Sequence, residues 1–491
     1  MRGRLWRGSR LGAATALAAV AALAPAGPAR ALPGSFDQVG HNALESRGVN
    51  AGLAVHGRYA YVGSRTDGSH PNAGIYVVDV GDPADPTVVH QVGPPDEGNL
   101  GESSRELRVW PQAGLLIVLN FGCDTVGHAC AGAASEPPAP SVRFYDIRGE
   151  NAARPKLVAT YSPPRLPHEM FLWVDPRRPR RALLYVTTPY LGEGTQQLIV
   201  LDVSRAREGR FRELGSWTAG IHDPEATPDL HSLGLSDDGR RAYLAYLGGG
   251  FLVADTSDFA LGRRSPRVRL VTPIANRVHW GDPGTHSAVK LFGRPYALTT
   301  DEVYGRAFGL APVLGFNVLK GCPWGWSRIV DVRDPTRPRI VAEHRLLPYN
   351  DPAYCESVFP LRNESASFSS HNPTLTRDLA LVTWHSGGLQ AISIRDPRHP
   401  AKVAEFLPEP LPAVATEDPA LSSGLDKVVM WSYPIVKDGL VYVVDLRNGL
   451  YVLRYRGPHE REIACMRFVE GNSNVGGGIR RQVPRANCRR R

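Results

Sequence analysis

The stretch Gly74-Ile-Tyr-Val-Val-Asp-Val-Gly-Asp-Pro83 decides the fold of this chain. Its β-branched and aromatic residues predict a strand, and its Gly-Asp-Pro ending predicts a turn. The pattern returns as Ser327-Arg-Ile-Val-Asp-Val-Arg-Asp-Pro335 and as Gly388-Leu-Gln-Ala-Ile-Ser-Ile-Arg-Asp-Pro397. Weaker copies lie at residues 142–147, 198–203, 251–256 and 450–455. The chain therefore contains seven copies of one repeat.

A second β-rich run precedes each copy, and a shorter strand is expected upstream of that run. These upstream strands are predicted at residues 50–55, 106–110, 168–173, 231–235, 286–291, 371–376 and 432–437. Four short strands per repeat, seven times over, are typical of a β-propeller. We therefore predict an all-β fold, a seven-bladed propeller of four-stranded antiparallel blades. No amphipathic helix of three turns is expected.

The last repeat lacks an obvious fourth strand. Residues 35–41 resemble the outer strand at 86–93, so we expect the N-terminal strand to close the last blade and to cover a sheet edge there. Residues 462–468 are the alternative source of that strand.

The segments "IYVVDVGDP", "RIVDVRDP" and "LQAISIRDP" resemble the LVIVD repeat over nearly all of residues 35–456. The resemblance implies an exported bacterial β-propeller and no particular chemistry, because a fold alone does not define a function. Histidine-lined propellers of similar appearance include the methanethiol oxidase (selenium-binding protein) family, which offers a more distant analogy.

The first 31 residues are typical of a signal peptide. Basic residues precede an apolar run from Leu11 to Ala24, and Ala29-Arg30-Ala31 offers a cleavage site. We expect cleavage after Ala31 and secretion, with a retained N-terminal anchor as the alternative. Residues 35–456 then form the propeller, and 457–491 form a C-terminal extension with a basic tail.

The formal net charge of +9 does not indicate a nucleic-acid partner. Five arginines lie in the first 31 residues, where no acid occurs, so the remainder carries +4. Six more arginines lie within residues 480–491, and without them the body is near −2. Nucleic-acid binding needs positive charge on the folded domain, so we expect no such partner.

Six cysteines in an exported chain indicate disulfides. Proximity in the sequence favours the pairs Cys123–Cys130, Cys322–Cys355 and Cys465–Cys488.

Histidine recurs at one position of the repeat. The side chains expected there are Glu106, His168, His231, His286 and His371. Because the propeller axis relates identical repeat positions, we expect these side chains to converge at one channel mouth, on the face of loops 304–326 and 384–388. Imidazole is a common metal ligand, and copper, zinc or iron would suit this set. The alternative is a structural histidine that bonds backbone at the blade junction or holds channel water.

A second layer of polar residues is expected to orient these imidazoles through their other ring nitrogen. It consists of His222, Asp223, Asp229, His279, Asp282 and His385. Asp-Pro pairs in these stretches are also ordinary turn formers.

The sequence predicts two alternative functions of different classes. The first is a monomeric binding or interaction scaffold that holds a small ligand, glycan or protein partner at its loop-rich face, with a His-lined ligand or metal site. The alternative is a copper-like metal-dependent oxidoreductase resembling methanethiol oxidase. A propeller hydrolase or lyase would need a carboxylate-rich centre, for which only Glu106 and Glu169 are present at the inner positions. No nucleophile elbow, phosphate loop or dinucleotide motif occurs.

Overall fold

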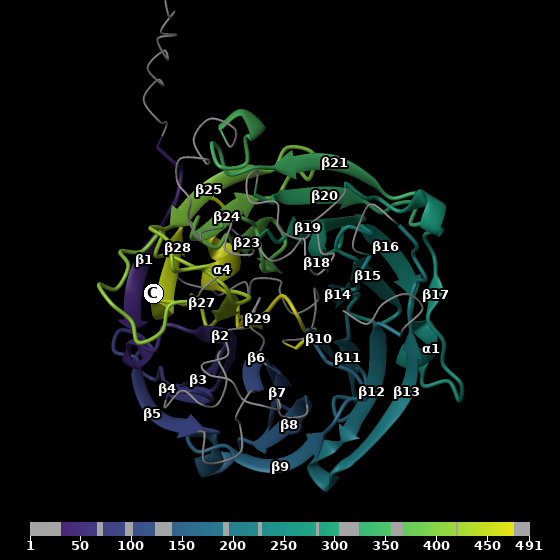
Figure 1. Ribbon diagram of the computed structural model, residues 1–491, viewed down its shortest axis with the longest axis horizontal. Coiled ribbons are helices and arrows are strands. Elements are labelled where there is room, and N and C mark those ends of the chain that lie inside the picture. Colours follow the sequence, from purple (N-terminus) through teal and green to yellow (C-terminus); the bar gives the residue numbers. More distant parts are fainter. Residues whose placement is uncertain are drawn as a thin grey trace, which may run out of the picture. The chain divides into compact units, whose positions relative to one another are not determined.

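The computed structural model describes residues 31–65, 72–93, 102–122, 140–189, 196–223, 228–280, 284–303, 324–354, 367–418 and 421–475. All strands of these residues belong to one compact unit, Pro33–Arg491. They form seven antiparallel sheets around a central channel (Figure 1). The predicted seven-bladed propeller is confirmed.

In blades one to six the strands follow one another in sequence from the channel outward. Blade one consists of β2 (Asn50–His56), β3 (Tyr59–Ser64), β4 (Ile75–Asp79) and β5 (Thr87–Val92). Blade two consists of β6 (Glu102–Trp110), β7 (Leu115–Gly122), β8 (Ser141–Asp146) and β9 (Lys156–Tyr161). Blade three consists of β10 (Met170–Val174), β11 (Ala182–Thr187), β12 (Leu198–Arg205) and β13 (Arg210–Trp217). Blade four consists of β14 (Ser232–Leu235), β15 (Arg241–Ala245), β16 (Phe251–Asp255) and β17 (Arg269–Leu270). Blade five consists of β18 (Thr285–Lys290), β19 (Tyr296–Asp301), β20 (Ser327–Asp331) and β21 (Arg339–His344). Blade six consists of β22 (Pro373–Leu375), β23 (Leu379–Thr383), β24 (Leu389–Ser393) and β25 (Ala401–Phe406).

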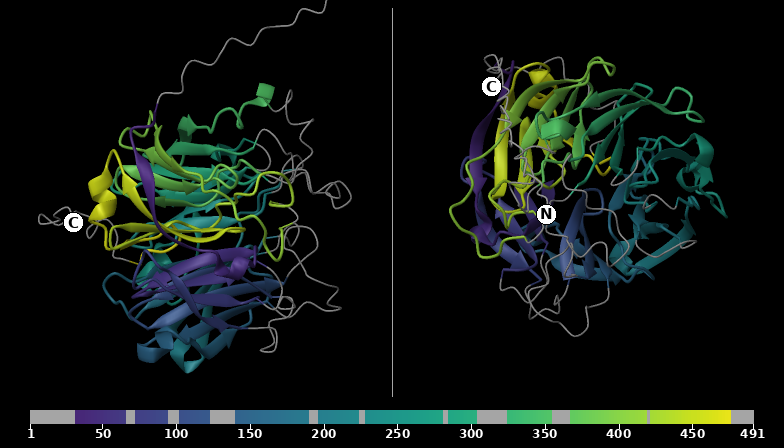
Figure 2. Two further views of the ribbon diagram at one scale, coloured as in Figure 1. Left: turned by 90° about the vertical axis from the view of Figure 1, so that its left-hand side faces the viewer. Right: turned by 45° about the horizontal axis from the view of Figure 1, so that its top comes forward.

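Blade seven joins the two ends of the propeller. Its strands are β26 (Ile435–Lys437), β27 (Leu440–Asp445), β28 (Gly449–Arg456) and the N-terminal β1 (Ser35–Asn42). Strand β1 pairs antiparallel with β28 and forms the outer edge of the blade (Figure 2). This confirms the predicted closure. The alternative segment instead contributes the helix α4 (Glu460–Ala464).

A short C-terminal segment enters the channel, and we call residues 468–475 the plug. Its strand β29 (Phe468–Val469) pairs with the inner edge of β26. Further along, Ser473 bridges to Leu172 of β10, and the Asn474 side chain bonds both the N–H and the carbonyl of Val174. The plug therefore spans the channel from blade seven to blade three.

The hydrophobic core lies between neighbouring blades. On β11, Leu184 packs toward blade two while its neighbours Leu183 and Tyr185 pack toward blade four. Successive side chains of a strand point to opposite faces, and here both faces are buried. This is why the repeats are nearly continuous apolar runs.

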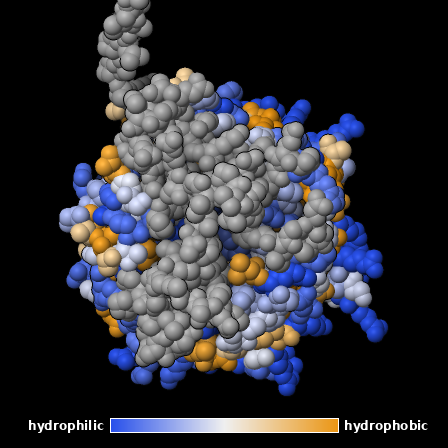
Figure 3. Space-filling view, in the orientation of Figure 1, coloured by the Kyte–Doolittle hydropathy of each residue, from blue (hydrophilic) through white to orange (hydrophobic). Residues whose placement is uncertain are grey.

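The described helices are short. Besides α4, they are the α-helix α1 (Ser257–Leu261) and the 3-10 turns η1 (Leu44–Ser46), η3 (Gly149–Ala152), η4 (Ala206–Glu208) and η5 (Ile274–Asn276). Within the described ranges, no helix is long and apolar enough to cross a membrane. On the face in Figure 3, described hydrophobic residues lie in small separate groups among polar ones.

The cysteine pairings stay predictions. Cys465 ends helix α4, whereas its expected partner Cys488 and the other two pairs, Cys123–Cys130 and Cys322–Cys355, lie outside the described residues.

Truncating Leu184 tests the interblade core. Leu184 is fully buried, so Leu184→Ala should lower the free energy of unfolding by about 2–5 kcal/mol through lost burial and a residual cavity. Urea denaturation measures this. Leu157→Ala on β9, where the side chain is 53% exposed, is the control and should change stability by less than about 0.5 kcal/mol. Equal losses in the two variants would contradict this picture of the core.

Candidate metal centre

Four of the predicted histidines form a continuous arc in the channel. The ring centroids of His168 and His231 lie 4.3 Å apart, those of His231 and His286 4.0 Å, and those of His286 and His371 4.3 Å. The ring of His385, expected in the second layer, joins the arc 4.6 Å from His371. All five residues are at most 3% exposed.

Hydrogen bonds from the preceding blade hold the backbone of three of these histidines. The Thr187 hydroxyl donates to the His231 carbonyl at 2.8 Å, and the Ser232 hydroxyl donates to the His286 carbonyl at 2.6 Å. The Thr300 hydroxyl donates to the carbonyl of His371. The arc is thus fixed by contacts between blades.

A β-bulge moves Glu106 away from the expected position. In β6 the register shifts between Ser104 and Glu106, which places Arg105 at the bulge, and a shift in β18 places His286 likewise. Accordingly Arg105 contacts the arc, with its Nη2 3.3 Å from His168 Nε2. The bulge therefore shifts the repeat position by one residue, from the expected Glu106 to Arg105, and sequence spacing does not reveal a bulge.

Glu106 itself forms a buried ion pair with Arg108, with Oε2 2.8 Å from Nη2. Other second-layer candidates also bond elsewhere: Asp229 accepts from the Gln197 side chain at 2.8 Å, and Asp223 pairs with Arg277 at 2.7 Å. His222 and His279 are exposed, and Asp282 lies outside the described residues.

The carboxylate that does meet the arc is Glu302, which the sequence analysis missed. Its oxygens lie 3.2 Å from His286 Nε2 and 3.1 Å from His371 Nε2. The Nε2 atoms of His231 and His385 are 3.7 and 3.8 Å away. Glu302 follows the second strand of blade five as His385 follows that of blade six. A search of the ends of the second strands, as well as the starts of the inner ones, would have found it.

Hydrogen bonds to Nδ1 fix how the rings face the channel. His371 Nδ1 lies 2.8 Å from the Trp431 carbonyl, which only accepts, so this nitrogen carries a proton. His385 Nδ1 lies 3.0 Å from the hydroxyl of Ser367, which itself donates to the Val303 carbonyl. Nδ1 of His385 is therefore the donor as well. In their neutral forms, both rings present an Nε2 lone pair to Glu302.

Several inward atoms make no hydrogen bond within the described part of the chain. They are Nε2 of His286, Nε2 of His371 and Oε1 of Glu302. Buried polar atoms are nearly always satisfied. The separations of 3.1–3.8 Å around Glu302 are close to the roughly 3.4 Å between ligands of a four-coordinate ion with 2.0–2.1 Å bonds. The arrangement thus has the donor types and spacing of a metal centre.

Burial governs the charges of the centre. It lowers the pKa of His286 to about 4 and holds the pKa values of His231 and His385 well below the ordinary value. Burial also acts against ionisation of Glu302, but His286 and His371 outweigh it and hold the pKa of Glu302 well below its usual range. Neutral imidazoles and an ionised carboxylate are the forms that bind metals.

An aromatic and basic wall borders the arc. The Trp431 ring lies 4.2 Å from His371 and stacks on His385 with 6° between the planes. The guanidinium groups of Arg65 and Arg105 lie 4.5 and 5.3 Å from the Trp431 ring. Arg65 also forms a buried ion pair with Asp418.

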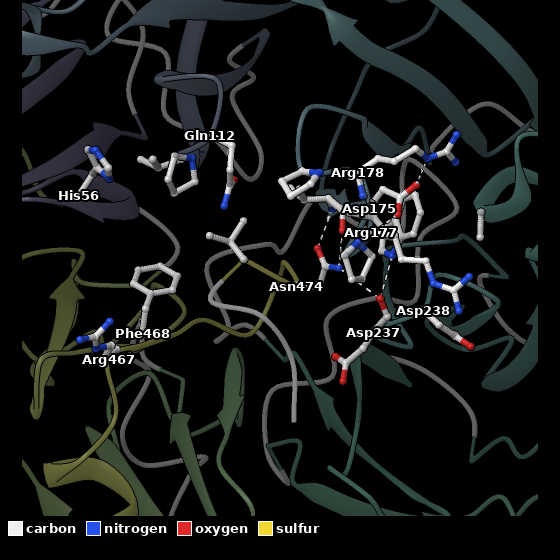
Figure 4. A pocket seen from close by; sticks show the side chains of 18 of the residues that line it. His56, Gln112, Asp175, Arg177, Arg178, Asp237, Asp238, Arg467, Phe468 and Asn474 are labelled. Carbon is white, nitrogen blue, oxygen red and sulfur yellow. Dashed lines mark hydrogen bonds and ion pairs between the residues drawn. The ribbon is translucent and has the colours of Figure 1, made fainter. Parts of the chain in front are cut away.

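A pocket of about 1010 Å³ lies away from the arc, among the turns that follow the inner strands. Asp175, Arg177 and Arg178 from blade three, Asp237 from blade four and Asn474 of the plug line it (Figure 4). Asp175 is paired with Arg178, with 2.9 Å between Oδ2 and Nε. None of the arc histidines lines this pocket.

One repeat family matches part of the chain. The LVIVD repeat family matches residues 48–93, which span blade one. The chain thus carries an LVIVD repeat within a seven-bladed β-propeller. No curated protein matches it. Among solved structures, Saccharomyces cerevisiae Sqt1 is similar with a TM-score of 0.47 and 9% identity, over 86% of this chain and 99% of that chain. Chaetomium thermophilum Raptor gives 0.47 and 11%, over 87% and 30%. Likenesses at this level carry no argument about function.

The lowered pKa of His286 predicts acid sensitivity in protein dialysed against a chelator. The unfolded ring titrates near 6.5, whereas the folded ring titrates near 4. The unfolded state therefore gains the proton first, and stability should fall as the pH drops from about 6.5 to 4. Urea denaturation at a series of pH values measures this slope. His286→Asn should flatten it, whereas His399→Asn, at a ring that is 82% exposed, should not. An unchanged slope in His286→Asn would contradict the assignment.

Proposed function

We propose that this propeller binds a first-row transition ion in its channel, through His286, His371, His385 and Glu302. One observation carries the proposal. His371 donates Nδ1–H to the Trp431 carbonyl, so its neutral ring turns an Nε2 lone pair toward a Glu302 oxygen only 3.1 Å away. Two acceptors this close repel each other unless a cation lies between or beside them.

The donor set limits the choice of ion. Three imidazoles and one carboxylate are ligands for zinc, copper or iron, whereas magnesium and calcium prefer oxygen ligands. The outward Nδ1–H bonds of His371 and His385 would hold the rings in the ligating tautomer. The competing explanation is a purely structural cluster in which a proton on His371 replaces the ion.

The wider role that we propose is ligand binding by an exported scaffold. Enlarged loops on one face of a rigid fold are where binding functions concentrate, and residues 304–323 connect to the centre directly through Glu302. A small ligand, glycan or protein partner would bind there. A metal-dependent oxidoreductase is the second candidate, favoured by a histidine-rich ligand set that also suits copper and iron. The identity of the ion distinguishes the two, because zinc carries no redox chemistry.

Metal analysis of a double variant tests the centre. His286→Ala with His371→Ala should abolish stoichiometric metal in protein purified from its native compartment, measured by elemental analysis. The sheets do not depend on these rings, so circular dichroism should be unchanged. His222→Ala at an exposed ring is the control and should keep the metal. Retention of metal in the double variant would refute the ligand roles, and loss of folding would favour the structural cluster.

We also propose that residues 1–31 direct export and are removed. The expected mature chain begins at Leu32, three residues before β1. Mass spectrometry of the secreted protein measures this terminus. An intact Met1 terminus on membrane-bound protein would instead favour the retained anchor.

A further inference from the structure

We propose that the channel holds a second metal position, formed by Glu169 with His168 and His231. This inference rests on the proposed function, which assigns the first ion to His286, His371, His385 and Glu302. The second ion would be another divalent first-row cation.

Two overlapping groups of ligand atoms support two positions. Within each group, the atoms lie no more than 4.8 Å apart: His286, Glu302 and His371 form one group, and Glu169, His231 and His286 form the other. His286 Nε2 is directed at Glu302, 3.2 Å away, and its Nδ1 is bonded to the Ser287 hydroxyl at 2.8 Å. His286 therefore belongs to the first ion, and Glu169 and His231 remain for another.

One oxygen of Glu169 makes no hydrogen bond within the described residues and could bind a cation. The plug residue Asn472 donates its side-chain N–H to Oε2 of Glu169 at 3.2 Å. The other oxygen, Oε1, has no hydrogen bond within the described ranges, although the residue is only 1% exposed. An unsatisfied buried carboxyl oxygen costs free energy. Burial and the neighbouring Glu106 raise the pKa of Glu169, so a cation that binds here would displace the proton of this carboxyl group. The plug thus orients Glu169 while leaving one ligand atom available.

His168 lies beside His231, with 2.7 Å between their Nε2 atoms. Ligands of a tetrahedral zinc ion are roughly 3.4 Å apart, so the two rings would separate by several tenths of an ångström to bind one ion. Arg105 only donates, so its contact shows that His168 Nε2 is a lone pair. Without an ion, a proton on His231 must bridge the two nitrogens. With an ion, both Nε2 lone pairs bind it, and the single proton of the neutral His231 ring lies on Nδ1, which has no hydrogen bond within the described residues.

Arg105 also sets the strength of this position. Its Nη2 competes for the His168 lone pair at 3.3 Å, and its positive charge repels a cation. At the first position, His371 and His286 use their Nδ1 atoms for other contacts and keep Nε2 for the ion. Zinc should therefore bind in two steps, a tight one at Glu302 and a weaker one at Glu169. Paired ions in one site can activate water or bind a small anion between them.

Zinc titration of the chelator-treated full chain tests the second position. Equilibrium dialysis with zinc alone, read by elemental analysis, should give two equivalents for the unmodified protein. Glu169→Gln keeps the size of the side chain and an oxygen for Asn472 but removes the group that can become a carboxylate ligand, so it should retain only the tight equivalent. His371→Ala should lose the tight equivalent instead. The matched control is Glu470→Gln, at another buried carboxyl group of the plug, which accepts from the Ser473 hydroxyl; it should keep both equivalents.

The outcomes separate the two proposals. One equivalent in both the unmodified protein and Glu169→Gln would overturn the second position and leave the first intact. No zinc in the unmodified protein would overturn both. If Glu169→Gln does not fold, His168→Ala serves the same purpose, since it removes another proposed ligand of the second position and should also leave one tight equivalent. Two equivalents in either variant would refute the assignment of these residues.

Discussion

Hydrogen bonds from the preceding blade hold the inner strands of blades four, five and six where their histidines enter the channel. Thr187 and Ser232 donate across blade boundaries to the carbonyls of His231 and His286. These bonds act where the interblade cores end and the channel begins, so they set the height at which each histidine enters. The rotation axis of the propeller then relates the rings of the inner-strand histidines to one another. The close approach of the four imidazoles at the starts of inner strands is a consequence of repeat symmetry combined with these anchors.

The sequence was sufficient for the fold because the repeat is locally consistent. Strand period, Asp-Pro turns and a spacing near 60 residues all indicate the same blade, and the N-terminal strand resembles the outer strand that it replaces. The arc was also predictable, since identical positions of a closed ring must converge. What sequence spacing could not supply was the register shift in β6, which brings Arg105 rather than Glu106 to the histidines. A bulge adds one residue without a compositional sign.

Glu302 was not predicted, for a different reason. It lies at the end of a second strand, where the repeat gives no recurring residue type: the equivalent position in blade six is His385. Charge balance alone could have indicated that a carboxylate was missing from the predicted site, because a metal site of neutral imidazoles lacks an anion. The tautomers, too, depend on contacts between distant segments, such as His371 with Trp431. Such contacts follow from the folded blades and not from any local pattern.

The two ends of the channel have different consequences for function. At one end the plug binds to β26 and β10 and holds Glu169 through Asn472, so the C-terminal extension is part of the polar centre rather than an appendage. At the other end Glu302 and His385 lie where second strands end and the connecting loops begin. Glu302 is thus positioned by the end of a second strand, whereas Glu169 is held by a hydrogen bond from the plug. Because segments far apart in the sequence position these two carboxyl groups, a change in the plug acts on Glu169 without acting directly on Glu302.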